Sequence, residues 1–213
     1  MVTSMKPAKS AERRPYHHGD LRRALVDAAR RLLEVEGPSA LSLRAVAREA
    51  GVSPAAPYHH FKDKSELLEA IAQEGWELLN TQLAEAKARD PGPHGLTGIG
   101  IAYVCFAQAN PALYRVMYDM VREREALPEG TQTDNDSGYR LVRDTMVENG
   151  ADPSAETDLE LATIACWCSA HGLAEMAAFK QFEHLKDELG GERPFLDGVL
   201  SHLGLFTKKM RDH

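Results

Sequence analysis

A short stretch of the chain places small side chains before a series of hydrogen-bond donors. The small residues would let the backbone approach the base edges in a DNA major groove; they are Ser53, Pro54, Ala55 and Ala56. The donors would reach phosphate oxygens beside that groove; they are Tyr58, His59, Lys62 and Lys64. This order of residue types predicts a short helix that contacts nucleic acid, beginning at Ser53 and ending near Phe61.

The stretch follows another short helical pattern at helix-turn-helix spacing. Ser42 suits the N-cap of the first helix, and Gly51 suits the left-handed residue that ends it. Ser53 and Pro54 suit the N-cap and first position of the next helix. About four residues separate the two helices, which is typical of a steep crossing. Arg44, near the start of the first helix, and the Ser42 hydroxyl are therefore further candidates for DNA contact.

The residues before this pair complete a three-helix head. Leucine and alanine recur at helical spacing over residues 21–33, and Gly37 ends that run. His17 and His18 stand just before it, where they could meet phosphates or belong to a free arm. Residues 1–15 are basic and lack apolar periodicity, so we expect a flexible arm there.

The charge is divided unevenly along the chain. Residues 1–64 carry 12 Lys and Arg against 7 Asp and Glu, whereas residues 65–213 carry 13 against 25. The formal net charge is −7, which conceals a head of +5 and a body of −12. Phosphate attraction is long-ranged, so this division favours one end that meets a polyanion. A basic tail before an ordinary domain is the alternative.

The rest of the pattern is helical, so we expect an all-α chain of about nine helices. Asp63 and Glu66 form a capping box that begins a long helix, running to about Lys87. Further helices are expected over residues 96–109, 111–122, 153–182 and from 196 towards 210, with a disordered loop over 123–138. The 43% of hydrophobic residues is enough for a buried core and excludes a fibrous or disordered chain.

Bulky uncharged residues lie on several of these helices and could surround a cavity. Aromatic rings and methionines with one or two polar groups are typical of a small-molecule site. The candidates are Trp76, Leu79, Tyr103, Phe106, Met117, Met120, Met146, Trp167 and His171. The alternative for each residue is a place in a filled core.

Cysteine and histidine residues in the second half of the chain suggest a metal site or a cysteine pair, which the sequence favours less than a small-molecule cavity. Cys166, Cys168 and His171 resemble a metal set, but Cys166 and Cys168 would point about 200° apart on a helix. We therefore expect no metal and no cofactor. Cys105 could pair with one of the other two, although buried thiols are usually inert. Residues 161–174 are uncharged but fall short of the roughly 18 needed for a membrane span.

Three motifs together resemble the tetracycline-repressor-like (TetR/AcrR) family of transcriptional regulators. They are Tyr16–Leu21 (YHHGDL), Leu43–Ser53 (LRAVAREAGVS) and Pro57–Lys64 (PYHHFKDK), which cover the DNA-binding head of that family without a gap. Asn110–Arg115 (NPALYR) and Trp167 with His171-Gly172 resemble the subgroup whose C-terminal domain is named for a Trp-His-Gly motif.

The resemblance implies a flexible arm over 1–15, a DNA-binding domain over 16–64, and an effector-binding and dimerisation domain over 65–213. It implies a non-enzymatic repressor that a small molecule releases from double-stranded DNA. The odd number of cysteines and the lack of an apolar stretch near residue 1 favour the cytoplasm. A homodimer is expected from the apolar helices, and its two-fold symmetry implies a palindromic operator. The apolar helices over 153–182 and 196–210 are the expected dimer interface. A small helical enzyme using His171 and Glu175 at i and i+4, and an architectural DNA-binding protein without an effector, are the alternatives.

Overall fold

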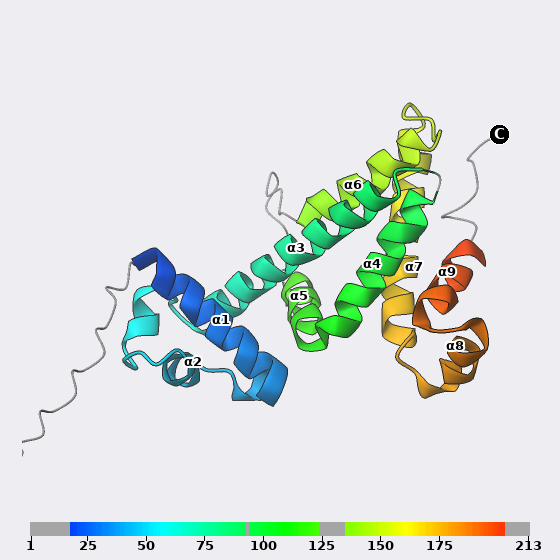
Figure 1. The fold of residues 1–213 in the computed structure, drawn as a ribbon. Helices are drawn as coiled ribbons and strands as arrows, with labels where there is room; N and C mark the ends of the chain where they lie inside the picture. Colours follow the sequence, from blue (N-terminus) through cyan, green and yellow to red (C-terminus); the bar gives the residue numbers. More distant parts are fainter. Residues whose placement is uncertain (1–17, 93, 124–134, 203–213) are drawn as a thin grey trace, which may run out of the picture.

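The computed structural model describes residues 18–92, 94–123 and 135–202, which form nine α-helices and three 3-10 helices without a strand (Figure 1). The all-α prediction is therefore confirmed for the described part of the chain. The N-terminal head contains α1 (His18–Glu36), η1 (Pro38–Ala40), α2 (Leu43–Glu49) and η2 (Ala56–His59). The predictions for His17 and for the arm over 1–15 lie outside the described residues.

α2 begins and ends where its sequence predicts. The Ser42 hydroxyl accepts a hydrogen bond from the Ala45 N–H at 3.1 Å, so Ser42 is the N-cap. Gly51 is left-handed, with φ of +68°. The Gly51 N–H donates to the Arg48 carbonyl at 3.1 Å and the Val52 N–H to the Ala47 carbonyl at 2.9 Å. These two bonds form a Schellman cap, which fixes the turn after α2.

The second half of the expected helix-turn-helix is not an α-helix. Pro54 and Ala55 form a turn, and η2 follows with bonds between residues three apart, such as Tyr58 N–H to the Ala55 carbonyl at 3.2 Å. Pro57 is buried and has no N–H, so it cannot donate the first α-helical bond to the Ser53 carbonyl. The prediction of an α-helix beginning at Ser53 is wrong, whereas the expected shortness of this element is confirmed.

The long helix α3 (Lys64–Arg89) joins the head to the body (Figure 1). Asp63 is its N-cap and accepts from the Glu66 N–H at 3.0 Å, while the Glu66 carboxylate accepts from the Lys62 N–H at 2.6 Å. Its 26 residues span about 39 Å at 1.5 Å per residue. One helix therefore reaches from the turn beside η2 into the body.

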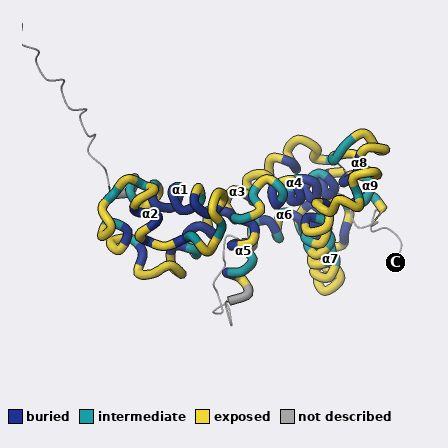
Figure 2. Tube along the Cα trace, turned by 90° about the horizontal axis from the view of Figure 1, so that it is seen from below, coloured by how far each residue is buried: buried dark blue, intermediate teal, exposed yellow. Residues whose placement is uncertain are grey.

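The body packs six helices around and beyond the second half of α3. They are α4 (Gly95–Ala109), α5 (Pro111–Glu123), α6 (Asn135–Glu148), α7 (Glu156–Met176), α8 (Glu183–Leu189) and α9 (Glu192–His202), with η3 (Lys180–Phe182) before α8. α3 contacts α4, α5 and α6, and α4 contacts α7 and α9. Figure 2 shows the inner faces of these helices buried, and the core runs without interruption into the head.

The expected loop over 123–138 is too long. α5 continues to Glu123 and α6 begins at Asn135, so only residues 124–134 stay outside the described part. Gly138 lies in α6, where an added Cβ would stand 2.9 Å from the Asn80 Oδ1 and 3.3 Å from a Leu83 methyl. The glycine lets α6 approach α3 closely, a tertiary contact that its polar flanking sequence does not reveal.

The expected helix over 153–182 is interrupted: α7 ends at Met176, η3 follows, and α8 begins only at Glu183. Phe179 is extended, with ψ of 127°, and the Phe182 ring then packs 5.9 Å from that of Phe195 on α9. This apolar contact turns the chain back onto α9, and no glycine or proline near 177–180 signals the break.

The apolar stripe of α9 faces its own chain. Phe195, Leu196 and Leu200 are buried, and α9 packs on α4. The prediction that this stripe faces a second subunit is therefore wrong over residues 196–200, and residues 203–213 lie outside the described part.

Among the described residues no single helix is long and apolar enough to cross a membrane. α4 and the first part of α5 pass that test only together, across a bend of 105°.

Candidate functional site

The head exposes most of the residues predicted to contact DNA. Those that reach solvent are Ser42, Arg44, Ser53, Pro54, Ala55, Tyr58, His59, Lys62 and Lys64, with Ala56 half-buried. Only the backbone of His18 is described, at the start of α1, and His17 is outside the described residues. α2, the turn at Gly51 and η2 thus present the small residues and the donors from consecutive elements.

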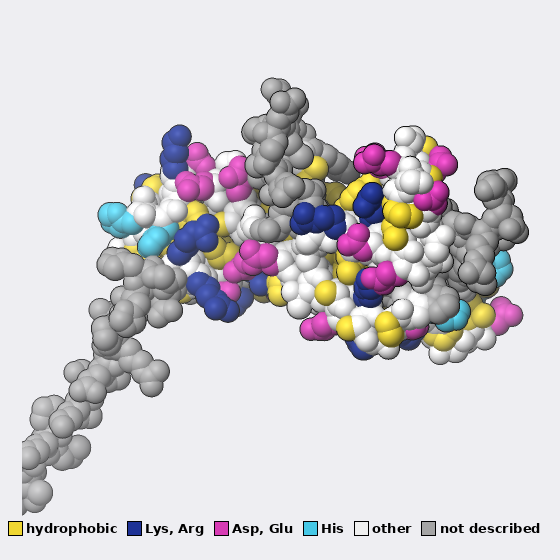
Figure 3. Space-filling view, turned by 90° about the horizontal axis from the view of Figure 1, so that it is seen from above, with side chains coloured by type: hydrophobic (Ala, Val, Ile, Leu, Met, Phe, Trp, Pro, Cys, Tyr) yellow, Lys and Arg dark blue, Asp and Glu magenta, His cyan; other side chains and the backbone are white. Residues whose placement is uncertain are grey.

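One buried ring and two exposed polar contacts hold this surface on α1 and α3. Phe61 is fully buried beneath the guanidinium of Arg22, which lies 5.3 Å from the ring centroid. Arg31 pairs with Glu49 at 3.1 Å, and the Lys64 ammonium donates to the Pro38 carbonyl at 3.0 Å. Figure 3 shows Lys and Arg side chains gathered over this end of the molecule, with acidic side chains between them.

A cleft of about 840 Å³ opens in the body between α4, α5, α7 and the start of α9. Most of its lining residues carry polar groups, and Tyr114 and Tyr118 add aromatic rings. The lining residues are Ala107, Gln108, Pro111, Tyr114, Arg115, Tyr118, Asp119, His171, Ala174, Glu175, Ala178 and Glu192. A concave site of this size suits a small organic molecule.

Three tyrosines and a histidine meet behind the cleft wall. The Tyr103 hydroxyl of α4 lies 3.0 Å from that of Tyr114, 3.2 Å from the Nδ1 of His171, and within hydrogen-bond contact of the Tyr118 hydroxyl. The Tyr114 hydroxyl also contacts the Nδ1 of His171, and the Trp167 indole donates to the Tyr118 hydroxyl at 3.2 Å. We call these five residues the phenol cluster.

The hydroxyls of the phenol cluster are protonated and form one connected network. Burial raises the pKa of Tyr103, Tyr114 and Tyr118, so each hydroxyl keeps its proton. The Trp167 indole donates to Tyr118, whereas either oxygen can be the donor between two hydroxyls, and the tautomer of His171 sets the role of its Nδ1.

The predicted effector residues divide into two groups. Tyr103, Trp167 and His171 belong to the phenol cluster, and the Trp76 ring lies edge-on to Tyr118 with centroids 5.4 Å apart. The others are packed in the interior; they are Leu79, Phe106, Met117, Met120 and Met146. Of the whole predicted set, His171 alone lines the cleft. The predicted binding set stays a prediction.

Sequence reasoning missed most of the cleft wall, including its two tyrosines, Tyr114 and Tyr118. They lie four apart on α5 and therefore share a helix face. That spacing, beside the bulky residues already considered on 111–122, is a signal that could have found them.

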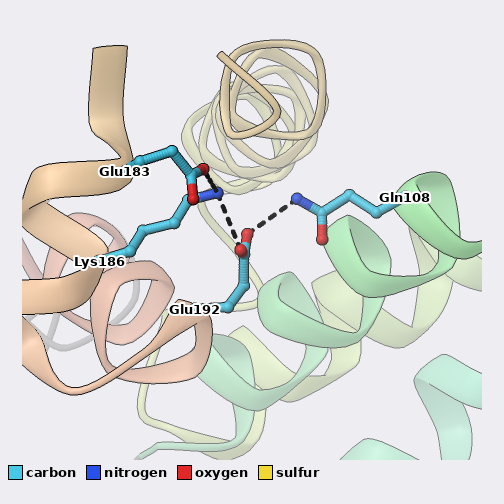
Figure 4. A network of polar contacts seen from close by, with 4 residues as sticks. All are labelled: Gln108, Glu183, Lys186 and Glu192. Atoms are coloured by element: carbon cyan, nitrogen blue, oxygen red, sulfur yellow. Dashed lines mark hydrogen bonds and ion pairs between the residues drawn. The ribbon is translucent and has the colours of Figure 1, made fainter. Parts of the chain in front are cut away.

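A four-residue network fixes the edge of the cleft at α9 (Figure 4). The buried Lys186 ammonium lies 2.9 Å from the carboxylates of both Glu183 and Glu192, and Gln108 donates to Glu192 at 2.9 Å. The bonds to Glu192 and Glu183 raise the pKa of Lys186. Burial acts to raise the pKa of Glu192, but the bonds from Gln108 and Lys186 outweigh it and lower that pKa. The network joins α4, α8 and α9.

The cysteines are separate free thiols. Cys105 and Cys168 are exposed, whereas Cys166 is buried, and burial raises the pKa of Cys166 to about 12. A thiol with so high a pKa carries almost no thiolate near neutral pH and is a poor nucleophile.

Comparison with known proteins decides the family. Residues 25–71 match the family model described as bacterial regulatory proteins, tetR family, and residues 96–192 match the tetracyclin repressor-like C-terminal domain. The chain belongs to the tetR family. It is accordingly a DNA-binding transcriptional regulator, and the recognition predicted from the three motifs is confirmed. The second match does not name the Trp-His-Gly subgroup, which stays a prediction.

Individual proteins agree with this tetR-family assignment. The chain is 27% identical over 186 residues to the uncharacterised HTH-type transcriptional regulator YobS of Bacillus subtilis, covering 85% of this chain and 94% of that protein. A solved protein of unknown function from Rhodococcus sp. RHA1 is 29% identical, with a TM-score of 0.71 over 92% of this chain and all of that one. A tetR-family regulator from Rhodococcus RHA1 shares the fold at 22% identity and a TM-score of 0.63, covering 90% and 98%.

Proposed function

We propose that this tetR-family regulator is a homodimeric repressor that leaves a palindromic operator when a small molecule occupies the body cleft. In this proposal residues 16–64 bind DNA, residues 65–213 bind the effector and the second subunit, and the protein acts in the cytoplasm. One observation carries the ligand response: α5 borders the cleft and also packs against α1 of the head.

The coupling has two physical routes. α3 begins beside η2 at the Asp63 cap, and its buried residues further along belong to the body core. The Arg30–Glu74 ion pair, at 3.3 Å, also joins α1 to α3. A ligand that displaces α5 would therefore move α1 directly and α3 through its packing on α5. A ligand shifts such an equilibrium only by its differential affinity for the two arrangements.

The dimer is supported by an apolar face that α7 turns outward. Leu161, Ile164 and Met176 are 60%, 44% and 47% exposed, and Cys168 and Gly172 lie between them on the same face. Figure 2 shows this exposure along much of α7. A second copy would cover the face by two-fold symmetry, and two heads would then read half-sites about 34–36 Å apart.

The test uses the two tryptophans as reporters, because both contact Tyr118 on the cleft wall. Full-length protein is bound to DNA from beside its own coding region, and candidate effectors are titrated while DNA release and tryptophan fluorescence are recorded. The two signals should change over the same concentration range. The Trp167→Phe variant should lose part of the fluorescence change and keep ligand-free DNA binding.

Three outcomes would contradict parts of the proposal. DNA binding that no ligand weakens would remove the effector role and favour an architectural protein. DNA release without a fluorescence change would place the effector away from the cleft. Increased transcription from the operator when the protein is added would make it an activator.

A further inference from the structure

We propose that the phenol cluster is a displaceable partition between the body cleft and an apolar pocket behind it, and that the effector is an amphipathic molecule. Its polar group lies in the cleft, and its apolar tail displaces side chains of the phenol cluster and fills the pocket. The inference rests on the proposed function in taking the cleft as the effector site. It adds the chemical class of the ligand and the residues that its tail meets.

The apolar pocket lies in the core between α3, α4, α6 and α7. Its volume is about 10 Å³, roughly the space of one water molecule. Its lining includes the buried side chains of Leu83, Val142 and Ala170, together with the rings of Tyr103 and Trp167. The polar atoms of these two rings bond within the phenol cluster. The pocket is therefore a poor site for water and favours an apolar group.

The phenol cluster forms the wall between this pocket and the cleft. Tyr103 and Trp167 line the pocket, whereas Tyr114, Tyr118 and His171 line the cleft. The two sets touch directly. The Tyr103 hydroxyl lies 3.0 Å from that of Tyr114 and 3.2 Å from the Nδ1 of His171, and the Trp167 indole donates to Tyr118 at 3.2 Å. A single layer of hydrogen-bonded side chains thus separates a polar cleft from an apolar pocket.

The phenol cluster can yield to a ligand at a lower cost than the other walls of the pocket. Tyr118, Trp167 and His171 are each partly exposed. Polar groups that separate there would face the cleft, where water or the polar group of the ligand can bond to them, so no buried group is left without a partner. Leu83 and Val142 are buried by other helices and have no such outlet. An apolar tail therefore enters the pocket from the cleft.

A tail in the pocket would act on the head through α3. Leu83 lies on α3, and this helix begins at the Asp63 cap beside η2. The polar group would act on α5, which borders the cleft. A ligand with both parts contacts the two helices that lead to the head, and it shifts their arrangement by its total differential affinity. An amphipathic molecule therefore uses both routes of the proposed coupling.

The experiment compares two probes of equal length, 1-hexanol and 1,6-hexanediol, which differ by one terminal hydroxyl. Binding to the full-length protein is measured by calorimetry and by tryptophan fluorescence. 1-Hexanol should bind at least about tenfold more tightly, because the diol would bury a hydroxyl without a partner in the pocket. Equal affinities would place both probes in the polar cleft and overturn the inference.

Variants of the pocket test where the tail lies. Val142→Ala enlarges the pocket and should tighten 1-hexanol binding several-fold without changing the diol. Val147→Ala, the same change on α6 at a partly buried position outside both linings, is the matched control and should alter neither. Ala170→Val fills the pocket and should reduce the preference for 1-hexanol to less than about twofold. Its control is Ala165→Val, at a half-buried position of α7 outside both linings. Circular dichroism shows whether each variant is folded.

The outcomes separate this inference from the proposed function. A preference for 1-hexanol that neither Val142→Ala nor Ala170→Val changes would place the tail elsewhere and overturn the inference. If the two probes bind alike while a wholly polar molecule in the cleft releases DNA, the inference fails and the proposed function stands. If 1-hexanol shows the expected preference and the expected response to the variants while no ligand releases DNA, the inference stands and the effector role fails.

Discussion

The cationic side chains of the head are largely exposed, whereas the polar groups of the phenol cluster in the body are hydrogen-bonded to one another. Lys62 and Arg44 are exposed, while Lys64 gives one of its three donors to the Pro38 carbonyl. The hydroxyls of Tyr103 and Tyr118 are hydrogen-bonded to each other in the phenol cluster, where Tyr103 is buried and Tyr118 partly buried. Changes in the exposed cations should therefore alter binding to DNA, whereas changes in the phenol cluster should alter the stability of the fold.

The first prediction concerns phosphate contact by Lys62. Lys62→Ala should weaken binding to all DNA sequences alike and lower the slope of log affinity against log salt by about one, because one counterion-releasing contact is lost. The measurement is a salt titration of DNA binding. Lys180→Ala, an exposed change in η3 far from the head, is the control. An unchanged slope in Lys62→Ala would show that this side chain does not reach a phosphate.

The second prediction concerns the phenol cluster. Tyr118→Phe removes the acceptor of the Trp167 indole and should lower the free energy of unfolding by about 1–3 kcal/mol, since a buried N–H is left without a partner. Urea unfolding measures the loss. Tyr139→Phe deletes a hydroxyl on α6 that makes only a long bond of 3.5 Å to the Glu160 carbonyl, and should cost little. Equal losses in the two variants would argue against the cluster.

At the scale of elements, close packing between helices explains why glycine occupies helical positions that helix propensity disfavours. Gly75 on α3 is buried, and an added Cβ would stand 2.5 Å from the Sδ of Met117 and 3.1 Å from a Leu113 methyl on α5. Asn110 acts locally instead: its side chain donates to the Phe106 carbonyl at 3.0 Å, closing α4 at the bend into α5. The glycine and the bend together position α5 between the head and the cleft.

The third prediction tests the α3–α5 approach. Gly75→Ala gains helix propensity of up to about 1 kcal/mol but must displace the fully buried Met117, at a cost of about 1–3 kcal/mol. We expect a net loss of stability in thermal unfolding. Gly198→Ala in α9, where an added Cβ meets nothing within 4 Å, should instead stabilise the protein by about 0.5–1 kcal/mol. Stabilisation by both changes would show that α5 yields easily.

At the scale of the whole molecule, α9 buries its apolar side chains within the chain, whereas α7 exposes an apolar face. The α9 stripe is buried within one chain, with Leu200 fully inaccessible, so a charge there would destabilise the fold before it could report on assembly. Within the described ranges, α7 presents an exposed apolar face that a second copy could cover. The proposed assembly therefore depends on α7 more than the sequence pattern of the C-terminal helix suggested.

The fourth prediction follows from that difference. Ile164→Glu should convert a dimer into a folded monomer and weaken operator binding, because a carboxylate buried in an apolar interface costs several kcal/mol without a partner. Sedimentation velocity gives the mass and circular dichroism the fold. Val35→Glu, at a position 83% exposed on α1, should leave the dimer intact. A variant Ile164→Glu that stays dimeric would move the interface away from α7.

The sequence by itself determined the features that depend on neighbouring residues. The Ser42 and Asp63 caps, the left-handed Gly51 and the all-α pattern follow from local hydrogen bonding and backbone sterics, and all are present. The family motifs lie in this same locally encoded head.

Tertiary structure alone decided what depends on residues far apart in the chain. The Phe182–Phe195 contact packs the segment after α7 against α9, and Gly138 admits α6 against α3. The phenol cluster joins residues up to 68 positions apart, from Tyr103 to His171. Periodicity shows which face of a helix is buried, but packing against other helices decides which side chains meet and where a cleft is left open.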